Sequence, residues 1–190
     1  NRFTAAVDVI GHELTHGITQ YTFNLNYSGQ SGALNESLSD VFGSLVKQWQ
    51  RTQGAAEADW LIGEGLFTSR VNGSAIRSLK EPGHAYDDPL LGKDPQPAHM
   101  RDYVTTLEDS GGVHVNSGIP NHAFFLTAVA LGGYAWEKAG RIWYVAATER
   151  FSPSTGFQAA AELTCRVAGE IFGINGPEQE AVRYGWEGVG

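Results

Sequence analysis

The chain has 190 residues with a formal net charge of −8, and 42% of its residues are hydrophobic and 11% aromatic. This length suits one domain with a substantial core, and the aromatic content argues against disorder. The negative charge argues against nucleic acid and anionic membrane surfaces as partners. No apolar run reaches the length of a transmembrane helix, and no signal peptide is recognised.

The first predicted element is a helix around the sequence His12-Glu-Leu-Thr-His16. Apolar residues recur through this segment at three- and four-residue steps: Phe3, Val7, Ile10, Leu14 and Ile18. This period is typical of an amphipathic helix. We expect the apolar stripe to face a hydrophobic core and the opposite face, which carries the two histidines, to face an open cleft.

The two histidines of this helix have the spacing of metal ligands. Residues four apart lie one above the other on one helix face, so both imidazoles can reach one zinc ion at about 2.0–2.1 Å. Glu13 points about 100° away round the helix, which places it beside a water on the metal. The pattern H-E-x-x-H therefore predicts two zinc ligands and a general base. A chance match to a five-residue pattern is the alternative.

A second helix is predicted from Asn35 to about Gln50. Its apolar side consists of Leu38, Val41, Phe42, Leu45 and Trp49. Glu36 would complete a zinc site of two histidines and one glutamate, with a fourth position left for water. Asn35 and Asp40 would support the ligands from behind, Asp40 by accepting the free N–H of a histidine. An exposed acidic face near a helix N-terminus is the alternative.

Three motifs in this sequence together resemble those of the thermolysin-like neutral metalloproteases. They are His12-Glu-Leu-Thr-His16, Ser31-Gly-Ala-Leu-Asn-Glu-Ser-Leu-Ser-Asp40 and Gly111-Gly-Val-His-Val-Asn-Ser-Gly118. The resemblance covers essentially the whole chain, and thermolysin is itself the standard example of this zinc ligand set. It implies a mainly all-α fold like the family's C-terminal domain, with a β-rich N-terminal domain absent from residues 1–190. It also implies a secreted zinc endopeptidase acting on peptides or proteins.

The resemblance assigns further residues to the reaction. Tyr27 and His114 would donate hydrogen bonds to the oxyanion of the transition state, and Asp109 would orient His114. The residues taken alone leave other roles open, because Tyr27 also fits a surface aromatic residue and His114 a structural histidine.

A substrate site is implied in the same way. Arg77 matches the family arginine that holds a substrate backbone carbonyl, although a structural ion pair is the alternative. The residues that match the walls of the pocket for the residue after the scissile bond are all apolar: Phe3, Val9, Ile62, Leu66 and Ile76. A large hydrophobic residue is therefore expected at that position of the substrate.

A cation cluster is expected beside the first helix. Asp8, Asp59 and Glu64 match carboxylate ligands of the family's calcium site, but Lys47 stands where the family commonly has a glutamate. Calcium takes six to eight oxygen ligands, and an ammonium group among them opposes its binding. We expect Lys47 to replace calcium and to neutralise the three carboxylates. Lys47 also resembles the protealysin-like branch of the family; a solvated lysine is the alternative.

The rest of the chain is predicted to be scaffold. Residues 68–109 are rich in Gly, Pro and Asp and are expected to be irregular. Helices are predicted at 120–131, at 136–150, from 154 or 155 to 173, and from 177 onward. Cys165 lies in the third of these and is expected to be a small buried apolar residue. The whole is expected to be an all-α domain of five or six helices.

These observations lead to the hypothesis of a zinc-dependent endopeptidase in which Glu13 moves the proton of the attacking water. An isolated zinc-binding domain, inactive without its N-terminal half, is the alternative. A zinc aminopeptidase is a third possibility, but no group is recognised that would bind a free substrate amine.

Overall fold

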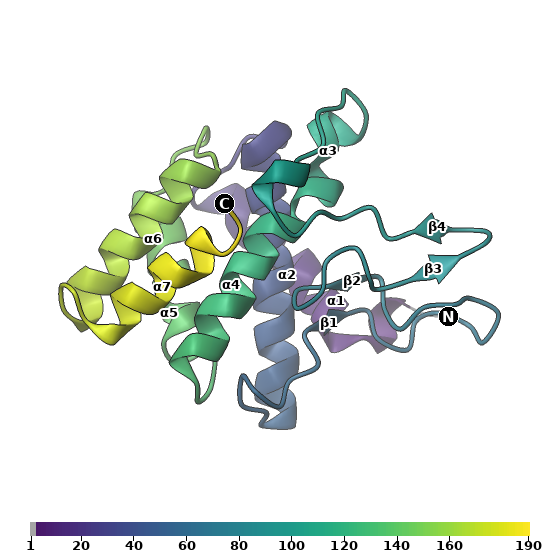
Figure 1. Ribbon diagram of the computed structural model, residues 1–190, viewed down its shortest axis with the longest axis horizontal. Helices are drawn as coiled ribbons and strands as arrows, with labels where there is room; N and C mark the ends of the chain where they lie inside the picture. The colour runs from purple at the N-terminus through teal and green to yellow at the C-terminus, as the bar shows by residue number, and fades with distance from the viewer. Residues whose placement is uncertain (1–2) are drawn as a thin grey trace.

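The computed structural model describes residues 3–190, and α-helices dominate it (Figure 1). The helical segments are α1 (Val7–Tyr21), α2 (Gly29–Arg51), α3 (Asp109–Asn116), α4 (Gly118–Leu131), α5 (Ala139–Arg150), α6 (Phe157–Phe172) and α7 (Pro177–Glu187). The segment α3 contains Ser110, Gly111 and Gly112 with positive φ, so it is a kinked turn rather than a regular helix. The predicted mainly all-α class is therefore confirmed.

The connection between α2 and α3 is long and has little regular structure, as predicted for residues 68–109. Two short antiparallel strand pairs lie in it: β1 (Leu61–Ile62) with β2 (Arg77–Ser78), and β3 (Asp87–Asp88) with β4 (Gly92–Lys93). Two 3-10 turns complete the described elements: η1 (Phe3–Ala5) and η2 (Met100–Asp102). Figure 1 shows β3 and β4 at the tip of an arm that projects away from α5, α6 and α7.

The helix α2 runs through the middle of the molecule, with α4 between it and the layer of α6 and α7 (Figure 1). Every residue of α2 from Ser31 to Val41 is buried. Large side chains that are at most 2% exposed pack around it: Leu38, Val41, Trp60, Ile119 and Phe124. Because α2 is enclosed in this way, the polar side chains that it directs toward α1 are held in fixed positions.

Glycines set the distance between α1 and α2. A Cβ atom added to Gly11 would lie 3.0 Å from the Cα of Gly43. One added to Gly43 would collide with the carbonyl oxygen of Asp8 and lie 3.1 Å from the backbone nitrogen of His12. Only residues without a Cβ allow this approach. The close crossing brings the histidine face of α1 onto the start of α2.

The apolar stripe of α1 does not face the core, so that prediction is wrong. Ile10, Leu14 and Ile18 are 40%, 68% and 50% exposed, and Trp49 on α2 is 68% exposed. The buried residues of α1 are instead small or polar: Asp8, Gly11, His12, Thr15 and Thr19. Helical periodicity identifies an apolar face, but it does not identify what covers that face. Among residues 3–190, no helix is both long and apolar enough to cross a membrane.

The second helix begins at Gly29 rather than at Asn35. Ser28 has the extended backbone of an N-cap residue, and Gly29 follows it with a φ of +54°. The helix therefore begins six residues earlier than predicted, at a glycine whose backbone conformation other residues rarely adopt. The remaining predicted helices start up to three residues early or late, as is common at helix ends. Cys165 is half-buried rather than buried.

Candidate metal centre

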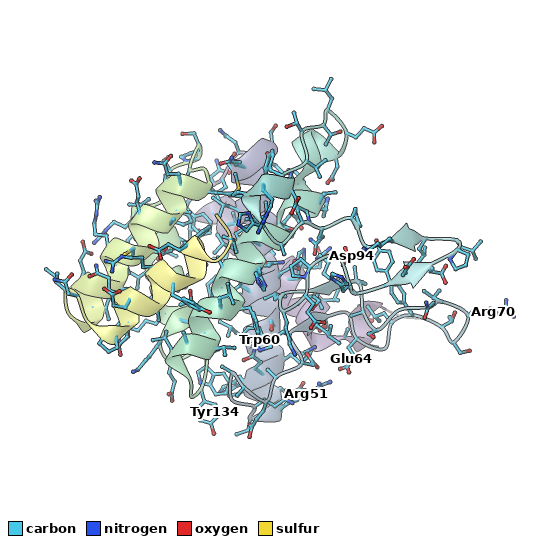
Figure 2. The ribbon with its side chains drawn as sticks, in the orientation of Figure 1. Arg51, Trp60, Glu64, Arg70, Asp94 and Tyr134 are labelled. Carbon is cyan, nitrogen blue, oxygen red and sulfur yellow. The ribbon has the colours of Figure 1, made fainter. Side chains whose placement is uncertain are left out.

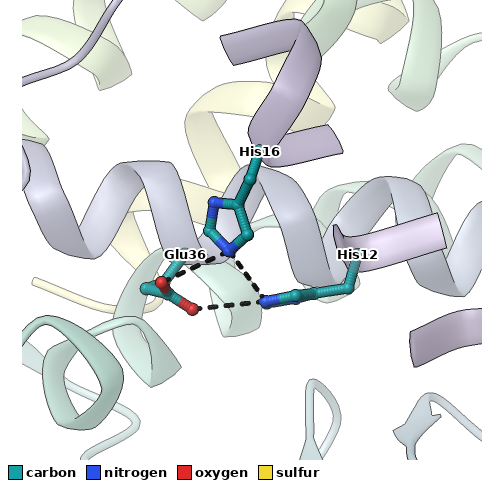
Figure 3. Close-up of side chains that lie close together, drawn as sticks. All are labelled: His12, His16 and Glu36. Carbon is teal, nitrogen blue, oxygen red and sulfur yellow. Dashed lines mark hydrogen bonds and ion pairs between the residues drawn. The ribbon is translucent and has the colours of Figure 1, made fainter. Parts of the chain in front are cut away.

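Three side chains from two helices converge on one point (Figure 3). The Nε2 atoms of His12 and His16 on α1 lie 3.0 Å apart. Glu36 on α2 places Oε2 3.4 Å from Nε2 of His12 and Oε1 3.5 Å from Nε2 of His16. One ligand atom from each residue lies within 4.8 Å of the other two. The structure thus brings together the three residues that the sequence predicted as metal ligands.

These separations fit a zinc ion. A tetrahedral zinc with ligands at about 2.0–2.1 Å separates neighbouring ligand atoms by roughly 3.3–3.4 Å. The glutamate supports the same interpretation, because Glu36 is 1% exposed and its Oε2 has no hydrogen-bond partner among the described residues. A buried carboxylate oxygen is normally paired or coordinated to a metal. The two imidazoles and one carboxylate are also ligands that zinc prefers.

Polar groups behind the histidines fix their ring orientation. Nδ1 of His12 lies 2.8 Å from Oδ1 of Asp40. Nδ1 of His16 lies 2.9 Å from Oδ1 of Asn35 and 3.2 Å from Oγ of Ser39. With Nδ1 held by an acceptor, the lone pair of each ring is on Nε2, which faces the point of convergence. Ser39 was not predicted, although it lies one turn after Asn35 on the same helix.

The buried charges of the site stabilise one another. Burial opposes ionisation of Asp40, but the Arg77 guanidinium and His12 hold the pKa of its carboxyl group well below the usual range. Burial also opposes protonation of His12, but the hydrogen bond to Asp40 and the nearby Glu36 carboxylate outweigh it and raise its pKa to about 9. Burial opposes ionisation of Glu36, but the nearby His12 and the bond with Tyr27 outweigh it and lower its pKa. A metal cation would therefore compete with a proton for His12.

Tyr27 and His114 lie on the other side of Glu36. The hydroxyl group of Tyr27 donates to Oε1 of Glu36 and lies 3.2 Å from Nε2 of His114. Asp109 holds His114 twice, through Nδ1 at 2.6 Å and through the backbone nitrogen at 2.8 Å. Burial, followed by the bond to Glu36, raises the pKa of Tyr27, so its hydroxyl group remains a donor at neutral pH.

The backbone around His114 explains why this stretch is rich in glycine. Asp109, Ser110, Gly111 and Gly112 all have positive φ values, between 50° and 87°. A Cβ atom on Gly111 would lie 3.0 Å from the backbone nitrogen of Gly29. The tight turn therefore packs against the start of α2 and brings His114 to the metal centre.

The comparison with known proteins agrees with this geometry. Residues 23–190 match the family model described as "Thermolysin metallopeptidase, alpha-helical domain". The chain belongs to this family. The resemblance drawn from the three motifs is confirmed.

Several members of the thermolysin family are similar to this chain. An extracellular metalloprotease of Pectobacterium carotovorum subsp. carotovorum is 55% identical over 191 residues, covering 100% of this chain and 54% of the relative. A thermolysin of Alicyclobacillus acidocaldarius subsp. acidocaldarius is 35% identical over 195 residues, covering 99% and 33%. The solved precursor of protealysin from Serratia proteamaculans superposes with a TM-score of 0.97 at 56% identity, covering 100% and 59%. The chain thus spans about half the length of the first of these relatives.

The proposed general base of this thermolysin-family chain is exposed. Glu13 follows His12 on α1 and lines a cavity of about 280 Å³. The other lining residues are Thr4, Val9, Ile10 and Leu14. A carboxylate that is open to solvent can receive and release a proton.

The predicted substrate-binding residues are only partly accessible. Nε and Nη2 of Arg77 both donate to Asp40 at 2.8 Å, which is the structural ion pair considered as the alternative. Leu66 and Ile76 are half-buried and adjacent, since both approach the position of a Cβ on Gly63. Ile62 is 1% exposed and belongs to the core, so it is not an open pocket wall in this structure. The side chain of Phe3 lies outside the described part of the chain.

The predicted cation cluster is present, but Lys47 contacts two of the three expected carboxylates rather than all three. Lys47 is 3% exposed, and its Nζ lies 3.1 Å from Asp8 Oδ2, 2.8 Å from Asp59 Oδ1 and 2.6 Å from the carbonyl oxygen of Leu61. It is therefore not a solvated lysine. The prediction that Lys47 also neutralises Glu64 is wrong, because Arg51 pairs with Glu64 at 3.2 Å.

Arg51 also pairs with Asp59 at 2.9 Å. Figure 2 labels Arg51 and Glu64 beside the C-terminal end of α2. It was missed in the sequence, although it lies four residues after Lys47 and hence on the same helix face. Burial opposes ionisation of Asp59, but its bond with Lys47 lowers its pKa. Two cations thus share the carboxylates of this cluster.

Proposed function

We propose that this chain carries the zinc-binding and catalytic groups of an endopeptidase that hydrolyses peptide bonds. The observation that supports this most directly is the metal centre. Two imidazole Nε2 atoms and an otherwise unpaired buried carboxylate oxygen of Glu36 converge at the separations of zinc ligands. His12, His16 and Glu36 would hold the ion, and membership of the thermolysin family agrees with this chemistry.

Zinc bound at this site would lower the pKa of water and polarise a substrate carbonyl group. The other steps belong to side chains of the chain itself. Glu13 accepts the proton of the attacking water and delivers it to the nitrogen of the leaving amine. Tyr27 and His114 donate hydrogen bonds to the oxygen that becomes negative, and Asp109 keeps Nδ1 of His114 occupied so that Nε2 is the donor.

Substitution of Glu13 separates chemistry from metal binding. We expect Glu13→Gln to retain zinc and to lose peptidase activity, because the amide keeps the shape of the side chain but accepts no proton. Zinc content by elemental analysis and turnover of a quenched fluorescent peptide measure the two effects. Persistent turnover by this variant would show that Glu13 is not the base.

A preference for a large hydrophobic residue after the scissile bond is proposed because the residues expected to line that pocket are apolar. Val9, Leu66 and Ile76 are half-buried apolar side chains from α1 and from the connection after α2. Mass spectrometry of fragments from a denatured protein substrate would identify the residues on each side of every cut. Cuts that show no enrichment of large apolar residues at that position would contradict the preference.

We further infer that the chain requires a second polypeptide region for activity. The exposed stripe of α1 continues into a groove between α1, α2 and α5 with a volume of about 580 Å³, lined almost entirely by apolar atoms. Leu14, Trp49 and Tyr144 line it and are 68%, 68% and 53% exposed. Apolar patches of this kind mark interaction sites. The proposed occupant is the additional region of the longer relatives, an N-terminal, mostly β domain that would form the other wall of the substrate cleft.

Complementation tests this requirement. Peptidase activity is measured on the 190-residue chain alone and after addition of the separately produced N-terminal region of the protealysin precursor. We expect zinc binding in both samples and turnover only in the second. Full turnover by the chain alone would contradict the requirement. In the variant Leu14→Asp, the added N-terminal region should restore much less activity than it restores to the parent chain.

Two further properties complete the proposal. Lys47 takes the place of calcium between Asp8 and Asp59, so we expect no calcium to bind there. Anomalous scattering from calcium at that position would contradict this. We also propose export from the cell, as the name of the Pectobacterium relative suggests. Detection of the protein only in cell pellets, and not in culture medium, would contradict export.

A further inference from the structure

The carboxylate of Asp40 is the most heavily bonded group behind the metal centre. It is 0% exposed, and its Oδ1 accepts from Nδ1 of His12 and from Nη2 of Arg77, both at 2.8 Å. Its Oδ2 accepts from Nε of Arg77 at 2.8 Å and from Nδ2 of Asn121 at 2.9 Å. Each oxygen thus has two donors. The amide group of Asn121, in the first turns of α4, has no role in the proposed reaction.

We propose that Asn121 is a positioning residue of the metal centre. It holds the Asp40 carboxylate from α4, and Asp40 in turn holds the imidazole of His12 with Nε2 toward the ligand point. This inference rests on the proposed function, since it requires the site to bind zinc.

Asn121 connects Asp40 to α4, whereas Arg77 connects it to β2. The two bonds from Arg77 come from one planar guanidinium group, so they fix the carboxylate with respect to β2 only. The bond from Asn121 adds a contact to α4, which packs in the core through Ile119 and Phe124. Asp40 is then anchored to three other elements: α1, β2 and α4. Groups that orient metal ligands in this way strengthen metal binding.

Burial shows that the fold alone does not favour an asparagine at this position. Asn121 is 0% exposed, and its Oδ1 has no hydrogen-bond partner within residues 3–190. An unpaired buried carbonyl oxygen destabilises a protein, whereas an apolar side chain of similar size carries no such penalty. Replacement by leucine should therefore affect metal binding and stability in different directions.

The experiment compares Asn121→Leu with the parent chain and with Thr127→Val. Thr127 is a matched control on the same helix, because it is also 0% exposed and its hydroxyl group donates to the carbonyl oxygen of Ala123 within α4. Three quantities are measured on the full 190-residue chain. They are the Kd for zinc by competition with a chromophoric chelator, the absorption spectrum of the cobalt(II) form, and the Tm of the metal-free chain.

We expect Asn121→Leu to weaken zinc binding about tenfold, at the lower end of the effect of groups that orient metal ligands. The cobalt spectrum should shift, because the ring of His12 is no longer fixed, while the metal-free Tm stays the same or rises. Thr127→Val should retain the zinc affinity and cobalt spectrum of the parent chain. If Asn121→Leu does not fold, Asn121→Ala removes the same amide group without adding bulk and carries the same expectation for zinc and cobalt.

Three results would overturn the inference. An unchanged zinc Kd and cobalt spectrum in the Asn121 variant would show that it does not act on the metal centre. An equal loss of affinity in Thr127→Val would show a general loosening of α4. A parent chain that binds no zinc would overturn the proposed function and this inference with it. The other two results are measured on variants and overturn this inference alone.

Discussion

The helix α2 contributes to two clusters of buried carboxylates that differ in their cations. Near its start, Glu36 faces the histidines of α1 and leaves Oε2 without a hydrogen-bond partner among the described residues. Near its end, Lys47 places its ammonium group between Asp8 and Asp59. The two clusters use the same acidic residue types, and both lie between α1 and α2.

The groups that face these carboxylates distinguish a metal site from an ion-pair cluster in this fold. A lysine or arginine beside a carboxylate neutralises its charge and repels a metal cation from the same place. Glu36 instead faces two imidazoles. A neutral imidazole can offer the lone pair of its Nε2 atom to a metal. We therefore assign zinc to the first cluster and an internal ammonium group to the second. Substitutions in each cluster and changes of pH test this assignment.

The largest expected effect is on zinc binding by Glu36→Gln. The amide preserves the size of the side chain but removes the negative charge and one anionic ligand. We expect the Kd for zinc to rise about a thousandfold, which corresponds to roughly 4 kcal/mol. Chelator competition measures it, with Glu13→Gln as control, since that carboxylate directly follows His12 on α1 but is not a proposed ligand. An affinity equal to that of the parent would remove Glu36 from the coordination sphere.

Removal of the internal ammonium group should have the next largest effect. Lys47→Met leaves Asp8, which is 1% exposed, without its cation. Loss of one partner of a buried pair costs about 3–5 kcal/mol of unfolding free energy. Urea titration measures the change. Arg51→Met is the matched control on the same helix face, and its half-exposed pair with Glu64 should contribute less than about 1 kcal/mol. Equal effects of the two substitutions would contradict the assignment of Lys47 as the central cation.

The sequence predicted the metal centre better than it predicted the surface around it. The spacing of His12 and His16 is a local property of one helix, so it could be read without knowledge of tertiary structure. Glu36 and Asp40 required only a second helix and its start. Helical periodicity likewise located the helices, because each apolar stripe repeats within one element.

Interactions between distant elements were not predictable in the same way. The exposure of Leu14 depends on what packs against α1, and no pattern within the chain specifies it. Asn121 reaches Asp40 across 81 positions of sequence, and its role is visible only when α4 is placed beside α2. Arg51 lies on the same helix face as Lys47, but its pairs with Asp59 and Glu64 depend on how the connection after α2 folds back, which no motif specifies.

The smallest expected effect distinguishes the clusters by pH. The folded chain raises the pKa of His12 to about 9 from its ordinary 6.5, so its contribution to stability is complete below pH 6.5 and is lost as pH rises toward 9. Asp59 has a lowered pKa in the folded chain, so its contribution is present above its ordinary pKa and is lost in acid. Of the two clusters, alkali therefore weakens the metal centre of the metal-free chain through His12, whereas acid weakens both, because Asp40 and Glu36 also have lowered pKa values.

Zinc should abolish only the alkaline part of this dependence, because a metal bound to Nε2 of His12 takes the place of the proton that would otherwise be lost as pH rises. Between pH 6.5 and 8, we expect the metal-free chain to lose on the order of 1–2 kcal/mol of unfolding free energy. Urea titrations at several pH values, with and without saturating zinc, measure the loss. His12→Gln should remove the alkaline dependence while leaving the acid dependence intact. If this variant still loses unfolding free energy in alkali, another group is responsible. The two clusters would then not differ in their pH dependence in the way proposed.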